Sequence, residues 1–228
     1  MKFINLFFGL WASIGLSIAL AQDNTQPLPK NPVLRRMPAF ASWSVTFKYK
    51  DEVVAQESGK PRALPDRVLS VTFTKTNKTY WEQTGMRSGK KYEKWIFDGV
   101  QLETEPDSPS IIPIPPPTKD MPESEYSDYS HGDFQGLQWV SLDTYKGIAS
   151  YEGKRAFLFE AEKEGQKVTA ILSMDMQLPL YSSVGDVACV YAYNVAPSTP
   201  LTPPARFLAV LATHKKGLEA LKYHPSRP

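Results

Sequence analysis

The feature that most constrains this chain is a regular alternation of side chains between residues 154 and 194. Apolar and polar residues alternate with a period of two on either side of Glu164 and Gly165, and the pattern resumes at residues 187–193. Period-two patterning with β-branched and aromatic residues is typical of strands, and a Gly-containing pair between two such runs is typical of a hairpin turn. The segment therefore predicts three antiparallel strands.

Shorter alternating runs upstream extend the same pattern. We expect strands at residues 41–50, 67–75, 79–83, 93–97, 100–103, 136–142 and 145–151. Turn residues separate several of these runs: Asn77 with Lys78, Ser88 with Gly89, and Asp98 with Gly99. Parallel strands need long crossover connections, which these short links cannot provide. The sequence therefore predicts an antiparallel sheet.

The C-terminal part of the chain changes character. Residues 196–204 are rich in Pro and Thr, and apolar residues then recur at roughly helical spacing. This pattern predicts a C-terminal helix at residues 203–223, which needs an apolar surface to lie on. We expect a mainly β fold: a curved antiparallel sheet or unclosed β-barrel with the C-terminal α-helix packed on it.

The N-terminus has the composition of a signal peptide. Lys2 precedes an apolar run that extends to Leu20, and Ala19 and Ala21 have the small-x-small spacing of a cleavage site. We expect residues 1–21 to direct export from a bacterial cell and to be removed, leaving a periplasmic or secreted protein with no stable membrane span. An uncleaved membrane anchor is the alternative, since the run approaches the length of a spanning helix.

Two proline-rich segments flank and interrupt the expected sheet. Residues 22–40 form a Pro-rich N-terminal arm, which cannot be helical, and residues 41–228 form a single antiparallel β domain. Within it, residues 105–130 form a Pro-rich loop with seven prolines and an acidic, aromatic end. This loop could cover a hydrophobic opening, dock a protein partner as a polyproline II segment, or be a disordered insertion.

Composition and motifs favour a non-enzymatic protein. The net charge is only +2, and no basic patch interleaved with aromatic residues suggests a nucleic acid partner. Cys189 is the one cysteine, so neither an internal disulfide nor a cysteine metal cage is possible. No phosphate-binding loop or nucleophile motif is present. His131 with Glu125 and Asp128 matches no strong ligand spacing, so we expect no metal and no cofactor.

Large aromatic side chains are numerous for a thin sheet. Most of them are explained by an ordinary core beneath the C-terminal helix. A curved sheet with one helix nevertheless has one deep concave side, and an unfilled part of it would be an apolar ligand pocket. The predicted ligand-binding residues are Trp43, Phe47, Phe73, Trp95, Trp139, Phe157 and Phe159.

Three segments resemble the periplasmic lipoprotein-carrier superfamily, which includes the Lol-type carriers and the related sigma-factor regulator domains. Residues 95–102 are similar to its strand–Asp-Gly–strand hairpin, residues 151–157 to a later strand entry, and residues 172–180 to a recurring strand with an Asp and a Leu-Pro. The resemblance implies an unclosed antiparallel barrel with an apolar concavity. The chain departs from the family because the arm at 22–38 replaces its first helix, and the Pro-rich loop replaces its usual middle.

These observations lead to one main hypothesis and two alternatives. We expect an exported, non-enzymatic binding protein that holds an apolar ligand, an acyl chain or a lipoprotein, on the concave side of a half-barrel. The first alternative is a structural or protein-interaction module of the bacterial cell envelope that uses the loop at 105–130. The second is a hydrolase or metal protein that uses His131.

Overall fold

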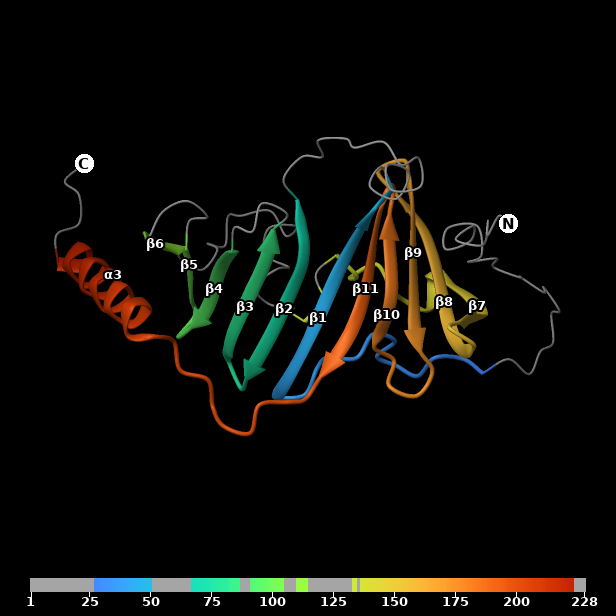
Figure 1. The fold of residues 1–228 in the computed structure, drawn as a ribbon, viewed down its shortest axis with the longest axis horizontal. Coiled ribbons are helices and arrows are strands. Elements are labelled where there is room, and N and C mark those ends of the chain that lie inside the picture. Colours follow the sequence, from blue (N-terminus) through green and yellow to red (C-terminus); the bar gives the residue numbers. More distant parts are fainter. Residues whose placement is uncertain are drawn as a thin grey trace, which may run out of the picture. The chain divides into compact units, whose positions relative to one another are not determined.

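The computed structural model describes residues 27–50, 67–86, 91–104, 110–114, 133–134 and 136–223. Within these residues the fold is mainly β, with eleven strands in one antiparallel sheet that is not closed. The strand order is β6-β5-β4-β3-β2-β1-β11-β10-β9-β8-β7, with one described helix, α3, near the C-terminus (Figure 1). The predicted fold class is therefore confirmed.

The chain divides into two compact units, which we describe separately. Unit 1 comprises residues up to Arg36 and residues 136–188, and unit 2 comprises residues 37–135 and 189–228. Unit 1 contains the 3-10 helix η1 (Leu142–Thr144), β7 (Tyr145–Tyr151), β8 (Lys154–Lys163), β9 (Gln166–Ser173) and β10 (Pro179–Val184). Unit 2 contains β1 (Phe40–Tyr49), β2 (Val68–Thr76), β3 (Thr79–Met86), β4 (Lys91–Phe97), β5 (Val100–Thr104), β6 (Ile111–Ile114), most of β11 (Val187–Asn194) and α3 (Ala205–Tyr223).

Two-residue turns join several neighbouring strands where the sequence predicts them. Asp98 and Gly99 have φ angles of 51° and 74° between β4 and β5. Glu164 and Gly165 have φ angles of 53° and 74° between β8 and β9. Positive φ at both central positions matches the right-handed twist of the flanking strands, which explains why such pairs form tight hairpins.

The predicted three-strand meander at residues 154–194 was one strand short. β10 lies between β9 and β11 and pairs with β9 in antiparallel register, with an irregularity between Pro179 and Tyr181. The strand was missed because it begins with Pro179 and its short sequence, PLYSSV, shows little alternation. Proline is tolerated at the first residue of a strand, where its missing N–H removes the least ladder bonding.

Part of the predicted Pro-rich loop is a strand, which corrects the prediction at residues 111–114. Leu102 is the register partner of Pro113, and Glu103 is the partner of Ile112. β6 ends the strand order, and an edge strand tolerates proline because one of its sides needs no hydrogen-bond partner. The segment is therefore part of the sheet rather than a free polyproline II rod. Residues 105–109 and 115–130 lie outside the described residues, as does the predicted turn at Ser88 and Gly89.

The predicted strand at residues 136–142 was also wrong. These residues form turns that lead into η1, and the N–H of Val140 donates to the carbonyl of Leu137 at 3.1 Å. The hydroxyl of Thr144 donates to the carbonyls of Trp139 and Ser141 at 3.2 and 3.1 Å. Short polar side chains that bond nearby backbone groups offer the chain an alternative to a ladder. Strand β7, by contrast, forms where it was predicted.

Helix α3 packs on the edge strands of unit 2, which confirms the predicted packing of the C-terminal helix on the sheet. Phe207 and Leu211 are buried in one cluster with Trp95, Val100 and Leu102. The amide of Leu201, in the segment before the helix, donates to the Thr76 hydroxyl at 2.7 Å.

The described part of the N-terminal arm, from residue 27 onward, contains neither helix nor strand before β1, as predicted. In unit 1, Gln177 at the β9–β10 turn fastens it: its Nε2 donates to the carbonyls of Lys30, Pro32 and Val33 at 2.7, 3.2 and 2.9 Å. The predicted signal peptide at 1–21 lies outside the described residues. No helix in the described part of the chain is long and apolar enough to cross a membrane.

Candidate functional site

The apolar side of unit 2 changes from one face of the sheet to the other between β2 and β3. Directly paired residues of antiparallel strands point to the same face. Trp43 is paired with Phe73, and Phe73 is paired with Glu82. Glu82 is in turn paired with Lys94. The face that is aromatic on β1 and β2 is therefore charged on β3 and β4.

The aromatic face of β1 and β2, which we call the Trp43 face, grades from buried to half-exposed. Trp43 is fully buried, with its ring stacked on Phe73 at 5.0 Å and tilted against Phe134 at 5.9 Å. Phe47 lies four residues after Trp43 on β1 and therefore points to the same face. Both Phe47 and Phe73 are half-buried. Val45 and Val71, each 6% exposed, form the floor between them. This gradient leaves apolar ring surface at the margin of a packed cluster.

Trp95 lies on the opposite face, which corrects the expectation that all predicted ligand-binding residues line one concave side. Its register neighbours are Trp81 and Leu102, and the Trp81 and Trp95 rings stack at 5.8 Å. Phe207 of α3 tilts against Trp95 at 6.1 Å. The helix thus covers the Trp95 face, and Trp95 is only 5% exposed.

The other three predicted residues belong to unit 1. Phe157 and Phe159 are 4% and 0% exposed, and both rings contact Tyr145, at 5.9 and 5.6 Å. Trp139 lies in the turns before η1 and is half-buried. Both faces of β8 are buried here, because Ala156 and Leu158 on the alternate positions belong to a second cluster with Ile171. The ligand-binding role of all seven residues remains a prediction.

Within the described residues, four tryptophans have a buried indole N–H for which no described residue supplies an acceptor: Trp43, Trp81, Trp95 and Trp139. A buried donor without an acceptor costs about 1–3 kcal/mol relative to a bonded one. Such donors next to apolar rings can be satisfied by a water or by a ligand that combines apolar surface with a hydrogen-bond acceptor. Sequence reasoning identified three of these side chains by their size but gave no sign of the missing acceptors.

Charged side chains accompany the aromatic ones on the Trp43 face, and sequence reasoning missed them. Nζ of Lys75 lies 2.6 Å from Oδ1 of Asp133, with both side chains 6% exposed. Lys94 bridges Glu82 and Glu103 at 3.2 and 3.5 Å. Lys75 occupies the same alternate positions of β2 as Val71 and Phe73, and this placement was the signal that the sequence offered.

Three tyrosines have perturbed acidities. Burial, followed by the influence of Tyr191, raises the pKa of Tyr193 far above its usual range. Burial also raises the pKa of Tyr145, with Arg155 acting in the opposite direction. Burial, then Glu152 and then Tyr181, raise the pKa of Tyr151. A phenol is already neutral at ordinary pH, and the raised pKa values extend this neutral, hydrogen-bond-donating form to more alkaline solution.

No group of three or more His, Cys, Asp and Glu residues capable of holding a metal ion occurs within the described residues. His131, Glu125 and Asp128 lie outside them. Whether His131 takes part in a metal site or a hydrolase site therefore stays untested, and both the expected absence of a metal and the alternative built on His131 stay predictions.

Comparison with solved structures finds weak similarity. The chain is similar to the crystal structure of a LolA superfamily protein from Nitrosomonas europaea, with 10% sequence identity, a TM-score of 0.32, and coverage of 79% of this chain and 97% of that one. No protein-family model and no curated protein matches the chain. The weak resemblance expected from the hairpin motifs is confirmed at this level, and it carries no conclusion about a ligand.

Proposed function

We propose that this protein is an exported, non-enzymatic binding protein that holds the acyl chain of a lipid or lipoprotein on the Trp43 face of unit 2. The observation that carries the proposal is the gradient on this face, where half-buried Phe47 and Phe73 continue an apolar surface from fully buried Trp43. Each Å² of apolar surface removed from water contributes about 25 cal/mol, so an alkyl chain laid on these rings is stabilised without polar contacts.

The charged pair on the Trp43 face supports a binding role. The buried Lys75–Asp133 pair on the same face is already satisfied internally, so it supplies neither a reactive acid nor a free cation. An apolar ring surface beside an internally paired charge favours binding over catalysis.

The protein-partner alternative at the Pro-rich loop has less support. In its described part, β6 is hydrogen-bonded to β5 and contacts α3, so this stretch belongs to the sheet along one of its sides.

A fatty-acid titration with paired variants tests the proposal. Phe47→Glu places a carboxylate on the half-buried margin of the Trp43 face, and we expect it to weaken binding of a fluorescent fatty acid by about tenfold or more. Thr46→Glu is the matched control, because Thr46 is exposed on the opposite face of the same strand. The melting temperatures of both variants establish that they are folded.

Native mass spectrometry of protein purified from its own cell envelope tests independently whether a lipid is bound. We expect a bound species with the mass of an acylated molecule. If no lipid is bound and the wild-type protein takes up no fluorescent fatty acid, the proposal is overturned. Equal weakening by Phe47→Glu and Thr46→Glu would move the ligand away from the Trp43 face.

A further inference from the structure

The face of unit 2 opposite to the Trp43 face has an uncharged polar centre on β1, β2 and β3. Directly paired residues of antiparallel strands point to the same face, so three rows of side chains can be followed across these strands. The rows are Ser42, Thr74 and Trp81; Ser44, Thr72 and Gln83; and Thr46, Ser70 and Gly85. None of these residues is charged, although 22% of the whole chain is. Because Lys, Glu, Arg and Asp are the residues most often exposed, an uncharged centre is unusual for a surface.

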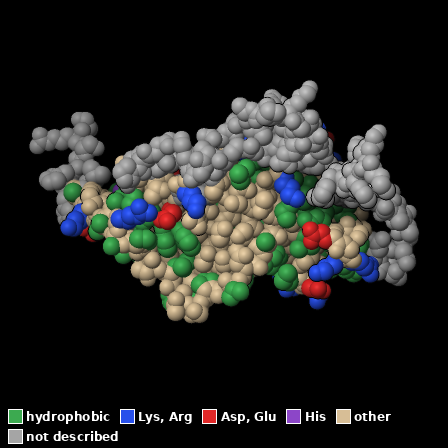
Figure 2. Space-filling model, viewed as in Figure 1, with side chains coloured by type: hydrophobic (Ala, Val, Ile, Leu, Met, Phe, Trp, Pro, Cys, Tyr) green, Lys and Arg blue, Asp and Glu red, His purple; other side chains and the backbone are tan. Residues whose placement is uncertain are grey.

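The middle of these rows is open to solvent. Thr46 and Asn194 are exposed, and Ser44, Thr72 and Gln83 are half-buried. Figure 2 shows a broad area over β1 and β2 without charged side chains, with Lys and Arg at its borders. A ligand can therefore reach the polar groups of this face.

Hydrogen bonds connect the middle row, which we call the Ser44 row (Asn194, Ser44, Thr72 and Gln83). Nδ2 of Asn194 donates to Oγ of Ser44 at 3.0 Å, and the hydroxyl oxygens of Ser44 and Thr72 lie 3.1 Å apart. One bond between two hydroxyls uses one hydrogen, so the other hydrogen remains for an outside acceptor, and the Gln83 amide can both donate and accept. Since neighbouring strands lie about 4.8 Å apart, the row spans roughly 14 Å from β11 to β3.

Trp81 borders the Ser44 row on one side. It is the register partner of Thr74, it is half-buried, and its ring stacks on Trp95 at 5.8 Å. On β4 the charge of Glu93 is matched by Arg206 of α3, whose Nη2 lies 3.1 Å from Oε2 of Glu93. The surface thus combines uncharged donors and acceptors with part of an aromatic ring.

We infer that the Ser44 row and Trp81 bind a neutral polysaccharide chain. Sugar hydroxyls both donate and accept hydrogen bonds, as the groups of this row do, and the C–H face of a sugar ring can pack on an aromatic ring. Nucleic acid requires Lys and Arg against its phosphates, and a bilayer surface requires an apolar face. An uncharged polyol matches the surface in both respects. The Ser44 row lies on the opposite face from Trp43, so the inference does not depend on the proposed acyl ligand.

Isothermal titration calorimetry of the purified chain tests the inference. The probes are four soluble neutral polysaccharides (laminarin, dextran, xyloglucan and galactomannan) and the acidic polysaccharide alginate, all at about 0.15 M salt to screen the net charge. We expect saturable binding of at least one neutral polysaccharide and no binding of alginate. Binding of none of the four, or tighter binding of alginate than of any of them, would overturn the inference.

Two variants and a control locate the binding surface. Thr72→Val with Gln83→Met removes hydrogen-bonding groups with little change in shape and should weaken binding at least about tenfold. Trp81→Leu, which keeps an apolar side chain without the ring, should weaken it similarly. Thr169→Val with Gln166→Met makes the same replacements on β9 of unit 1 and should leave the affinity unchanged. Melting temperatures establish that the variants are folded. Wild-type affinity of the folded Thr72 and Gln83 double variant, or an equal loss in the control, would contradict the assigned surface.

Discussion

Nζ of Lys75 lies 2.6 Å from Oδ1 of Asp133, and the other carboxylate oxygen of Asp133 accepts the amide of Met37 at 2.8 Å. One buried carboxylate thus holds β2 and the residue that precedes β1 by a short distance. The adjacent residue, Phe134, contacts Trp43 and Tyr191 with its ring. Asp133 and Phe134 therefore hold their segment against the Trp43 face, Asp133 through polar contacts and Phe134 through ring contacts. We call this pair of residues the clip.

Removing the Asp133 carboxylate should be strongly destabilising. Asp133→Ala leaves the Lys75 ammonium buried without its counter-charge, and we expect a loss of about 3–5 kcal/mol in the free energy of unfolding. Urea denaturation measures it. Lys215→Ala is the control, because the Lys215–Asp98 pair is exposed and its loss should cost less than about 1 kcal/mol. Equal effects of the two substitutions would contradict the clip.

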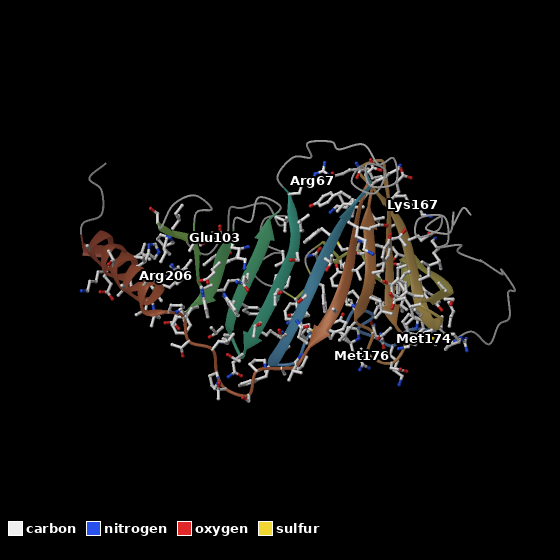
Figure 3. All side chains as sticks on the ribbon, viewed as in Figure 1. Arg67, Glu103, Lys167, Met174, Met176 and Arg206 are labelled. Atoms are coloured by element: carbon white, nitrogen blue, oxygen red, sulfur yellow. The ribbon has the colours of Figure 1, made fainter. Side chains whose placement is uncertain are left out.

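Gln177 should control access to the N-terminal arm. Its side-chain amide bonds three arm carbonyls, and its own carbonyl accepts the amide of Arg35 at 3.1 Å. Gln177→Ala removes the side-chain bonds and leaves buried carbonyls without donors. We expect trypsin to cleave after the exposed Arg35 and Arg36 about tenfold faster, as followed by mass spectrometry. Met176→Ala, in the same turn and exposed (Figure 3), should leave the cleavage rate unchanged.

The packing of α3 on the sheet should depend on Phe207. This side chain is fully buried against Trp95, so Phe207→Ala creates a cavity and should cost about 3–5 kcal/mol. Leu218→Ala, on the same side of the helix but exposed, should change the stability by less than about 0.5 kcal/mol. Thermal denaturation followed by circular dichroism compares the two variants. Similar melting temperatures of the two variants would show that Phe207 does not hold α3 on the sheet.

Tyr193 should make the fold sensitive to alkali. Its pKa is raised in the folded state, so the phenol stays protonated there while the unfolded chain loses the proton above its usual pKa, near 10. The contribution of Tyr193 is therefore intact below about pH 10 and is lost as the pH rises, by up to about 1.4 kcal/mol per pH unit. Denaturant titrations from about pH 9 to about pH 11 measure the slope. Tyr193→Phe should reduce it, and an unchanged slope would exclude Tyr193 as its source.

Local patterns predicted most of the strands because their information is short-range. The alternation through Trp43 and Phe47 placed β1, and the Asp98–Gly99 pair placed the turn after β4. β10 and β6 were missed because Pro179 and Pro113 disfavour strands locally, whereas strand neighbours, which the local sequence does not reveal, decide that a proline can be accommodated.

The composition of the candidate site was less predictable. Alternation shows which residues of one strand share a face, but it does not show which face of the next strand matches it. The pairing of Phe73 with Glu82 rather than with Trp81 set that relation, and it separated Trp95 from Trp43. A shift of one residue in register would have placed all these rings together. The Lys75–Asp133 pair was equally hidden, because its partners are 58 positions apart.

The change of apolar side between β2 and β3 gives unit 2 a built-in optical assay. Trp43 on β1 and Trp95 on β4 lie on opposite faces of the sheet of unit 2, so a quencher or ligand that reaches one ring is separated from the other by the backbone of the sheet. Fluorescence of variants that keep Trp43 or Trp95 as their single tryptophan would therefore show which face binds a ligand, and whether α3 leaves the Trp95 side of the sheet at the same time.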